Sequence, residues 1–366
     1  MYISEVSGHR NAATAIEGAL GILKPDIDTL NINAFNYTNP IAEKITNSIY
    51  MGIIKIAPQI WDYLYDNPKV LKRVERTKNN IHKANSPKLK KLFDRYRPDA
   101  VICTQAFPCG MVADYKKTYS SSVPLIAVLT DYIPHAYWVY DTVDYYIVPT
   151  EDIAATLIKR GVPSVKVKPL GIPFSPKFNQ QRPKEELLKN YNLKGETPII
   201  LIMGGGQGLG PIKEIVKSLE RVKEEIQEIV VTGTNSRLYN TLKRRIRRYK
   251  KKILLFGYTH RINEFMDLAD IIISKPGGIT TAEALSKGKP MIIIKPLPGQ
   301  EANNAAYLTS AGAAIKVDSP KEAYLAVDEL IKNPDKFSKL RESAKKIAKP
   351  KASIDIAEFI LKEIKV

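Results

Sequence analysis

Cysteine is nearly absent from this sequence: Cys103 and Cys109 are the only two in 366 residues. Two cysteines are too few for a disulfide framework, and no spacing typical of a metal site accompanies them. The chain also lacks the run of about 18 apolar residues that a membrane-spanning helix needs. Its first residues have neither the basic start nor the apolar core of a signal peptide. These absences predict a cytoplasmic protein that holds no metal ion and does not span a membrane.

Acidic residues are scarce relative to basic ones: 38 Asp and Glu stand against 56 Lys and Arg, for a net charge of +18. In the range 243–252, eight of ten residues are basic, and the range 69–97 holds eleven basic residues. Solvated helix faces, nucleic acid and an anionic membrane surface all suit such charge. Aromatic and aliphatic residues crowd the range 47–67, which fits either a buried helix pair or an amphipathic segment at a membrane interface.

The chain is too long for one ordinary core, and apolar runs of strand length alternate with helical periodicity along it. We expect a domain at 1–171, a second at 172–349 and a C-terminal helix at 350–366 that packs back on the first domain. This pattern is typical of parallel α/β sheets. The expected strands are Thr29–Asn33, Pro98–Cys103, Leu125–Leu129, Tyr145–Val148, Val165–Lys168, Pro198–Met203, Glu228–Thr232, Ile253–Phe256, Ile271–Ser274 and Met291–Ile294.

A polar loop follows the apolar run 271–273 in the second half. It reads Lys275-Pro-Gly-Gly-Ile-Thr280, and Gly277 and Gly278 allow a tight turn into a helix. The unpaired N–H groups at the start of such a helix favour a phosphate. Glu283 lies one turn into this helix, where a carboxylate can accept hydrogen bonds from two sugar hydroxyls.

A second polar loop follows the next apolar strand, and it ends in Gln300, Glu301, Asn303 and Asn304. One such loop is an ordinary strand–turn–helix connection. Two at successive strand ends, about 20 residues apart, predict a nucleotide-sugar site. The earlier glycine loop 204–210 does not follow the G-x-G-x-x-G pattern, and the strand after it ends in Thr232 with no acidic residue for a ribose. A dinucleotide-binding dehydrogenase is therefore disfavoured.

The chain resembles GT-B glycosyltransferases, in which two Rossmann-like doubly wound domains face a cleft. Within them it is similar to the family of bacterial processive diacylglycerol glucosyltransferases and plant monogalactosyldiacylglycerol synthase, and more distantly to the peptidoglycan GlcNAc transferase. The similarity covers nearly the whole chain. It rests on Ser7-Gly-His-Arg10 with its Ala-rich helix, Thr130-Asp-Tyr132 with His135 and Trp138, Gly171-Ile-Pro173, Phe256-Gly-Tyr258, Lys275-Pro-Gly-Gly-Ile-Thr280 and Pro298-Gly-Gln-Glu301.

One departure from the family lies at the N-terminus. Ser7-Gly-His-Arg10 has one glycine where relatives usually have two or three, and the strand before it is short.

The resemblance implies a role for each motif residue. His9 is expected to be the general base, since histidine suits proton transfer at neutral pH. Asp131, His135 and Trp138 are expected beside the acceptor. Glu283 should hold the ribose, Gly257 and Tyr258 the uracil, and Gln300 and Glu301 the hexose. The diphosphate is expected to face Lys275, Gly277, Gly278, Ile279 and Thr280.

The implied reaction is an inverting, metal-independent transfer of a hexose from a UDP-sugar to diacylglycerol or a related membrane lipid, which gives a glycolipid. No cofactor is implied besides the donor, and the enzyme is expected to dock on the anionic inner face of the cell membrane. The alternative on the same fold is a UDP-GlcNAc-using enzyme, either a polyprenyl-linked GlcNAc transferase or a 2-epimerase. A nucleic-acid-binding protein is a further alternative, although no recognised nucleic-acid module supports it.

Overall fold

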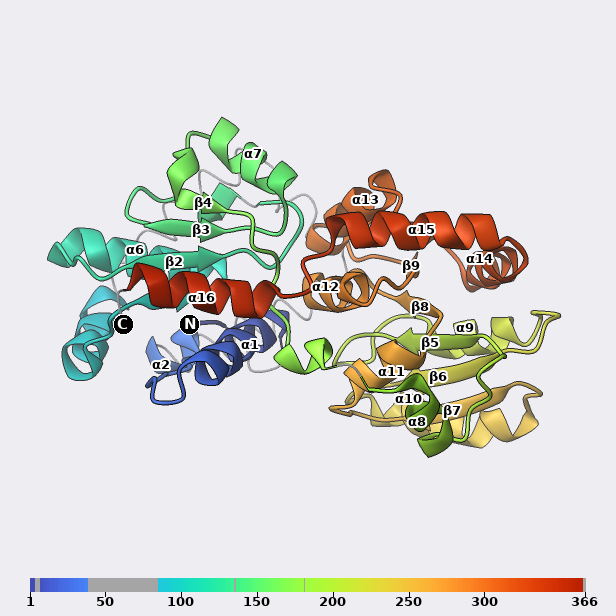
Figure 1. Ribbon diagram of the computed structural model, residues 1–366. Coiled ribbons are helices and arrows are strands. Elements are labelled where there is room, and N and C mark those ends of the chain that lie inside the picture. The colour runs from blue at the N-terminus through green and yellow to red at the C-terminus, as the bar shows by residue number, and fades with distance from the viewer. Residues whose placement is uncertain (4–6, 39–84, 135, 181, 365–366) are drawn as a thin grey trace. The chain divides into compact units, whose positions relative to one another are not determined.

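The computed structural model describes residues 1–3, 7–38, 85–134, 136–180 and 182–364 (Figure 1). The aromatic range 47–67, His135 and most of the basic range 69–97 lie outside these described residues. The chain divides into two compact units. The first contains residues 1–176, 297–300 and 351–366, and the second contains residues 177–296 and 301–350.

The first unit is built on a parallel sheet in the order β1-β2-β3-β4. Its strands are β1 (Val101–Cys103), β2 (Leu125–Val128), β3 (Tyr145–Ile147) and β4 (Val167–Lys168). On the other side of β1, Tyr2 forms a parallel bridge with Asn33. All four residues of β2 are buried, because helices cover both faces of the sheet.

Two apolar clusters cover the faces of this sheet. On one face, α1 (Gly8–Leu23) lies beside the C-terminal helix α16 (Ala352–Glu363), and both pack on β2 and β3 (Figure 1). On the other face lie α6 (Ala106–Tyr119) and the helical residues 85–96. Three short elements complete the unit: α2 (Ala34–Thr38), the 3-10 turn η1 (Ala136–Trp138) and α7 (Glu151–Lys159).

The second unit contains a six-stranded parallel sheet in the order β10-β9-β8-β5-β6-β7. This is the doubly wound order in which the first strand lies at the centre and the chain winds outward in both directions. The strands are β5 (Ile199–Met203), β6 (Gln227–Val231), β7 (Lys252–Phe256), β8 (Ile271–Ser274), β9 (Met291–Ile294) and β10 (Ala314–Val317).

Helices connect these strands and bury the hydrophobic core that contains Ile200, Val230 and Ile292. They are α8 (Lys184–Asn190), α9 (Ile212–Leu219), α10 (Ser236–Arg245), α11 (Ile262–Leu268), α12 (Gly278–Ser286), α13 (Gln300–Ser310), α14 (Pro320–Lys332) and α15 (Pro334–Ile347). Both units are thus Rossmann-like layers of parallel strands and helices, the two halves of the predicted GT-B fold.

Three of the predicted strands are markedly shorter in the structure, and the one expected at 98–103 keeps only Val101–Cys103. Residues 29–33 make only one bridge, between Asn33 and Tyr2, because Met1 makes its backbone hydrogen bonds to the β1 side instead. The strand expected at 165–168 begins as the 3-10 turn η2 (Ser164–Lys166), so β4 keeps only two residues. The second unit begins at Lys177, slightly after the expected boundary at residue 172, and α16 belongs to the first unit.

Candidate functional site

The strand order of the second unit brings two loops together. β5 and β8 are neighbours at the centre of the sheet, and from them the chain winds in opposite directions. In doubly wound sheets, ligands bind outside the carboxyl ends of the strands at this switch point. The loops that leave β5 and β8 are residues 204–210 and 275–277. The sheet therefore places the glycine loop next to the predicted diphosphate loop.

The glycine loop is shaped by close backbone contacts. Gly208 has φ of +60°, and a Cβ atom there would lie 1.9 Å from the carbonyl oxygen of Thr232. Gly210 also has a positive φ, and its Cβ position faces the side chain of Lys275 at 3.9 Å. In the sequence, the glycine pattern of this loop argues only against dinucleotide binding. Its five glycines directly after an apolar strand were the signal of a tight turn beside the site.

The start of α12 offers unpaired N–H groups. Gly277 caps the helix without a side-chain hydrogen bond, and the first intrahelical bond there joins the N–H of Thr281 to the carbonyl of Gly277 at 2.9 Å. Among the described residues, the N–H groups of Gly278, Ile279 and Thr280 have no hydrogen-bond partner. These groups, with the positive end of the helix dipole, suit an anion such as a diphosphate.

Lys275 is the buried cation of this region. Its ammonium group lies 2.9 Å from a carboxylate oxygen of Glu301, and its side chain is 9% exposed. The amide of Asn304 donates to the carbonyl of Pro276 at 3.0 Å, which fixes α13 against the turn. The structure therefore brings together Lys275 and Glu301, for which the resemblance implies separate partners, the diphosphate and the hexose. Because Glu301 neutralises the charge of Lys275, the unpaired N–H groups at the start of α12 are the groups in this loop that are available to an anion.

Glu283 lies in the second turn of α12 and is half-buried. Burial raises the pKa of its carboxyl group to about 8, and no ion pair among the described residues offsets this cost. The group is therefore mostly protonated at neutral pH. A ligand that donates two hydrogen bonds, such as a ribose, would favour the ionised form.

Gly257 and Tyr258 follow β7, at the edge of the sheet. The ring of Tyr258 is 60% exposed and meets the ring of His260 edge-on, with their centroids 5.3 Å apart. An exposed aromatic ring at the carboxyl edge of the sheet suits a flat base. The uracil role of Gly257 and Tyr258 stays a prediction.

In the first unit, His9 lies in the first turn of α1, which Ser7 caps by accepting from the N–H of Arg10. The Nδ1 atom of His9 lies 2.9 Å from the carbonyl oxygen of Thr104 and 3.0 Å from the hydroxyl of Thr130. A carbonyl oxygen only accepts, so Nδ1 carries the proton and Nε2 carries the lone pair. Burial lowers the pKa of His9 below its usual value, which keeps the ring neutral.

The predicted acceptor residues lie in different environments. Asp131 is half-buried, and its carboxylate accepts from the side-chain amide of Gln300 at 3.0 Å. Trp138 is 6% exposed and packs in the apolar cluster with α6, so its ring has little surface for an acceptor. Its burial favours a structural role, and the acceptor role assigned from the sequence stays untested. Among the described residues, no group of His, Cys, Asp or Glu is arranged to hold a metal ion.

Family models decide where this architecture belongs. The model of monogalactosyldiacylglycerol (MGDG) synthase matches residues 9–174, and that of the glycosyltransferase family 28 C-terminal domain matches residues 199–359. Together they cover most of both units. The chain belongs to the glycosyltransferase family that contains monogalactosyldiacylglycerol synthase.

Relatives and solved structures agree with this family. The chain is 34% identical to the processive diacylglycerol beta-glucosyltransferase of Bacillus subtilis over 90% of its own length and 86% of the relative's. It is 31% identical to the protein of the same name from Bacillus pumilus, with the same coverage. The crystal structure of MurG from Acinetobacter baumannii matches with a TM-score of 0.59 at 14% identity, over 76% of this chain and 77% of that one. UDP-GlcNAc 2-epimerase from Neisseria meningitidis matches with 0.55 at 18% identity, over 77% and 81%. These two structures show the fold alone.

Proposed function

We propose that this glycosyltransferase moves a hexose from a UDP-sugar to the free hydroxyl group of diacylglycerol and inverts the anomeric centre. The observation that carries this proposal is the similarity, over nine-tenths of the chain, to processive diacylglycerol beta-glucosyltransferases. The arrangement of side chains in each unit is suited to one half of the reaction.

The first unit supplies the base. The acceptor hydroxyl gives its proton to Nε2 of His9 while its oxygen attacks the anomeric carbon. Because Nδ1 is held by Thr104 and Thr130, the ring cannot turn its protonated nitrogen toward the acceptor. The proton taken up makes the ring cationic, and the negative charge of Asp131 favours that state.

The second unit holds the donor. As the bond from the anomeric carbon to the diphosphate breaks, negative charge grows on the departing UDP. The N–H groups of Gly278, Ile279 and Thr280 are already oriented when the donor binds, so they stabilise this charge without rearrangement. Glu283 binds the ribose hydroxyls as a carboxylate, and Glu301 holds the hexose. In this account the transfer needs no metal ion.

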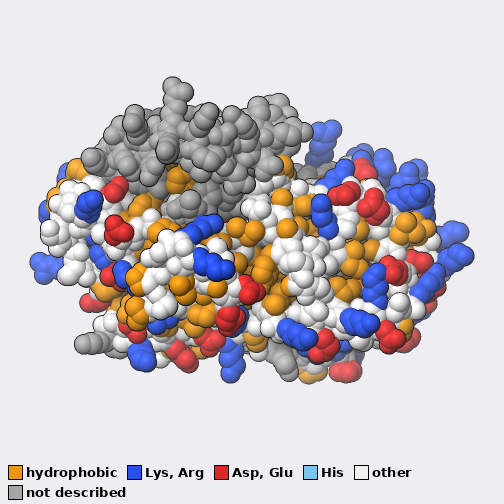
Figure 2. Space-filling view, turned by 90° about the horizontal axis from the view of Figure 1, so that it is seen from above, with side chains coloured by type: hydrophobic (Ala, Val, Ile, Leu, Met, Phe, Trp, Pro, Cys, Tyr) orange, Lys and Arg blue, Asp and Glu red, His pale blue; other side chains and the backbone are white. Residues whose placement is uncertain are grey.

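The acceptor implies a site of action at a membrane surface. No helix in the described part of the chain has both the length and the apolarity to cross a bilayer. Exposed cations at the end of α10 and in the turn η4 (Ile246–Arg248) favour contact with an anionic leaflet, which for this family we place at the cytoplasmic face. On the face that Figure 2 draws, Lys and Arg side chains are interspersed with Asp and Glu along the right-hand part.

Incubation of the protein with diacylglycerol vesicles and, separately, UDP-glucose, UDP-galactose or UDP-GlcNAc tests the proposal. A hexosyl-diacylglycerol formed from one of the first two donors supports it. Formation of UDP-ManNAc from UDP-GlcNAc, or transfer only to a polyprenyl-linked sugar, would replace it with one of the alternative functions on this fold.

A further inference from the structure

A hydrogen bond joins the first residue of α13 to the loop after β2. Nε2 of Gln300 donates to a carboxylate oxygen of Asp131 at 3.0 Å, although 169 residues separate the two. Both residues belong to the first unit, which includes residues 297–300. The resemblance assigns Gln300 to the hexose and Asp131 to the acceptor. This bond therefore connects two residues that are expected to serve different substrates.

The bond to Asp131 fixes the orientation of the Gln300 amide group. A carboxylate oxygen only accepts, so the NH2 group of the amide is directed at Asp131. The carbonyl oxygen of the amide, Oε1, is left for another partner. In the part of the chain that the structure describes, this oxygen accepts no hydrogen bond. Gln300 thus presents an acceptor of fixed orientation, which suits a sugar hydroxyl that donates.

The backbone on both sides of Gln300 is restrained. Pro298 has a fixed φ, and Gly299 follows it with φ of +83°. On the other side, the carboxylate of Glu301 lies 2.9 Å from the ammonium group of Lys275. The orientation of the Gln300 side chain therefore depends mainly on its own rotamer and on the bond to Asp131.

Asp131 also acts on the base. The residue before it, Thr130, places its hydroxyl 3.0 Å from Nδ1 of His9. Burial lowers the pKa of His9, and the negative charge of Asp131 offsets part of this effect. The neighbouring cation on α1, Arg10, is exposed, so that solvent screens its charge. A residue that binds Asp131 can therefore influence the base without touching it.

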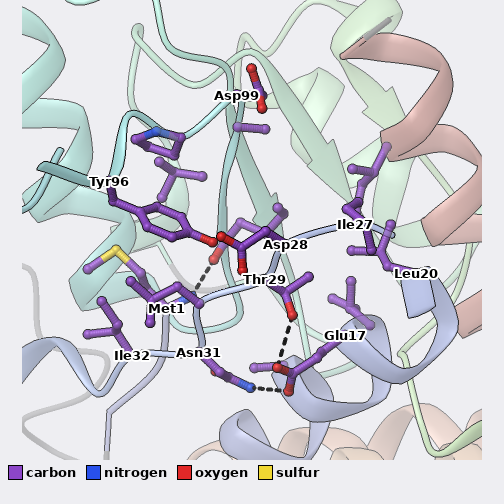
Figure 3. A pocket seen from close by; sticks show the side chains of 18 of the residues that line it. Met1, Glu17, Leu20, Ile27, Asp28, Thr29, Asn31, Ile32, Tyr96 and Asp99 are labelled. Atoms are coloured by element: carbon purple, nitrogen blue, oxygen red, sulfur yellow. Dashed lines mark hydrogen bonds between the residues drawn. The ribbon is translucent and has the colours of Figure 1, made fainter. Parts of the chain in front are cut away.

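Other carboxylates of the first unit face a cavity of about 400 Å³ instead (Figure 3). The acidic residues that line it are Glu17, Asp26, Asp28 and Asp99. The carboxylate of Glu17 accepts from the hydroxyl of Thr29 at 3.1 Å. Neither His9 nor Asp131 lines this cavity. Its carboxylates are thus separate from the bond between Asp131 and Gln300.

We propose that Gln300 is a positioning residue that links the bound hexose to the base through Asp131. Its Oε1 atom accepts from a hydroxyl of the hexose, while its NH2 group holds the Asp131 carboxylate. The link acts in both directions, because Asp131 orients the amide for the sugar and the amide restrains Asp131. This inference rests on the proposed transfer of a hexose, since the sugar is one member of the link.

The two partners of this bond should change the basicity of His9 in opposite directions. The N–H dipole of Gln300 directs its positive end at the carboxylate and offsets part of the field that Asp131 exerts on His9. Gln300→Met removes this dipole, so the titration midpoint of His9 should rise. Asp131→Asn removes the charge itself, so the midpoint should fall. A general disturbance of the site would move both variants in the same direction.

The first part of the experiment is a double-mutant cycle on donor affinity. Calorimetry measures the Kd of UDP-glucose, UDP-galactose and UDP for the parent, Gln300→Met, Asp131→Ala and the double variant. Each single variant should bind the UDP-hexose about fivefold more weakly, the loss of one hydrogen bond, and UDP as well as the parent does. The double variant should bind no more weakly, because both changes break the same link. The exposed Gln180→Met is the matched control.

The second part is an NMR titration of the histidine ring signals. The chain contains four histidines, and His9→Gln identifies the signal of His9. We expect its midpoint to rise by at least about 0.3 pH units in Gln300→Met and to fall in Asp131→Asn. A purely structural role of Gln300 would not produce these opposite shifts.

Affinity losses that multiply in the double variant, or His9 midpoints that move in the same direction, would overturn the inference. An Asp131→Ala variant that binds UDP-hexose as tightly as the parent would do the same. A parent that binds UDP but no UDP-hexose would overturn the proposed function together with this inference. Multiplying losses in a protein that binds UDP-hexose would overturn the inference alone.

Discussion

The Nδ1 atom of His9 and the carbonyl oxygen of Thr104 lie 2.9 Å apart, although 95 residues separate them. The hydroxyl of Thr104 completes the pair by donating to the carbonyl of His9 at 2.8 Å. This double contact ties the start of α1 to the end of β1. It fixes the proton on Nδ1 and leaves Nε2 as the basic nitrogen of the ring.

The pH dependence of turnover tests this base. The pKa of His9 lies below its ordinary value of 6.5, because burial outweighs the opposing effect of the Asp131 carboxylate. A base acts unprotonated, so kcat should rise with pH to a plateau, with a midpoint below 6.5. Asp131→Asn keeps a hydrogen-bond acceptor but removes the charge, so it should move the midpoint to lower pH. A midpoint that is the same in both proteins would show that another group limits turnover.

Glu283 gives a second pH signature, in donor binding. Its pKa of about 8 means that the carboxylate fraction grows roughly tenfold between pH 7 and pH 9. If the carboxylate holds the ribose, the Kd of UDP should fall over this range, and calorimetry measures it. Glu283→Gln should bind UDP weakly at every pH. The exposed Glu225→Gln serves as the matched control. A pH-independent Kd in the parent would remove Glu283 from the ribose role.

The same residue should also affect stability. The unfolded chain loses this proton near pH 4.5, whereas the folded chain keeps it up to about pH 8, so the stability of the parent falls over this interval. Glu283→Gln should therefore melt higher than the parent at pH 8 and close to it at pH 4.5. If the melting temperatures of the variant and the parent differ by the same amount at both pH values, burial does not raise the pKa of the Glu283 carboxyl group.

Glu301 distinguishes sugar binding from nucleotide binding. Glu301→Gln keeps the size of the side chain and weakens its ion pair with Lys275. If Glu301 accepts from the hexose, the variant should bind UDP-hexose about tenfold more weakly, the loss of one charge-assisted hydrogen bond, and UDP as well as before. Glu186→Gln, on an exposed part of α8, is the control. If the affinities for UDP and UDP-hexose fall equally, Glu301 does not bind the hexose. Its role is then to hold the loop in place through its ion pair with Lys275.

Vesicle binding tests the basic surface of the second unit. Lys243, Arg244 and Arg247 are exposed, and among the described residues they form no ion pair. Near an anionic leaflet each cation contributes about 1 kcal/mol at most. Reversal of these three charges should weaken sedimentation with phosphatidylglycerol vesicles at least about tenfold at low salt. The same reversal at Lys339, Arg341 and Lys346 on α15 changes the net charge equally. Equal loss in both variants would show a response to net charge alone.

The parts of the fold that could be predicted from the sequence are those that depend on neighbouring residues along the chain. Buried parallel strands are continuous apolar runs, so β8 and β9 were expected within one residue of their bounds. The start of α1 at Gly8 was also expected, since its apolar residues recur at helical spacing. The strand β10 was missed, because Ala314–Val317 is short and contains a charged residue.

The parts that could not be predicted depend on strand order and on contacts between distant residues. Nothing local shows that β5 lies between β8 and β6, so the glycine loop could not be placed beside Lys275. The hydrogen-bond partners of His9 could not be predicted from the sequence either. Nδ1 of His9 is bonded to Thr104 and Thr130, and the partner atom of Thr104 is a backbone carbonyl oxygen, which any residue type carries.

The most direct test of the central claim is the product made from diacylglycerol vesicles and a UDP-hexose in the presence of a chelator. We expect a hexosyl-diacylglycerol whose anomeric linkage, assigned by NMR, is inverted to β. We also expect that His9→Ala lowers kcat by about 10²–10⁴-fold with unchanged UDP affinity, while the exposed neighbour Asn11→Ala does neither. An α-linked product, a rate abolished by the chelator, or a His9→Ala variant as active as the parent would contradict the central claim.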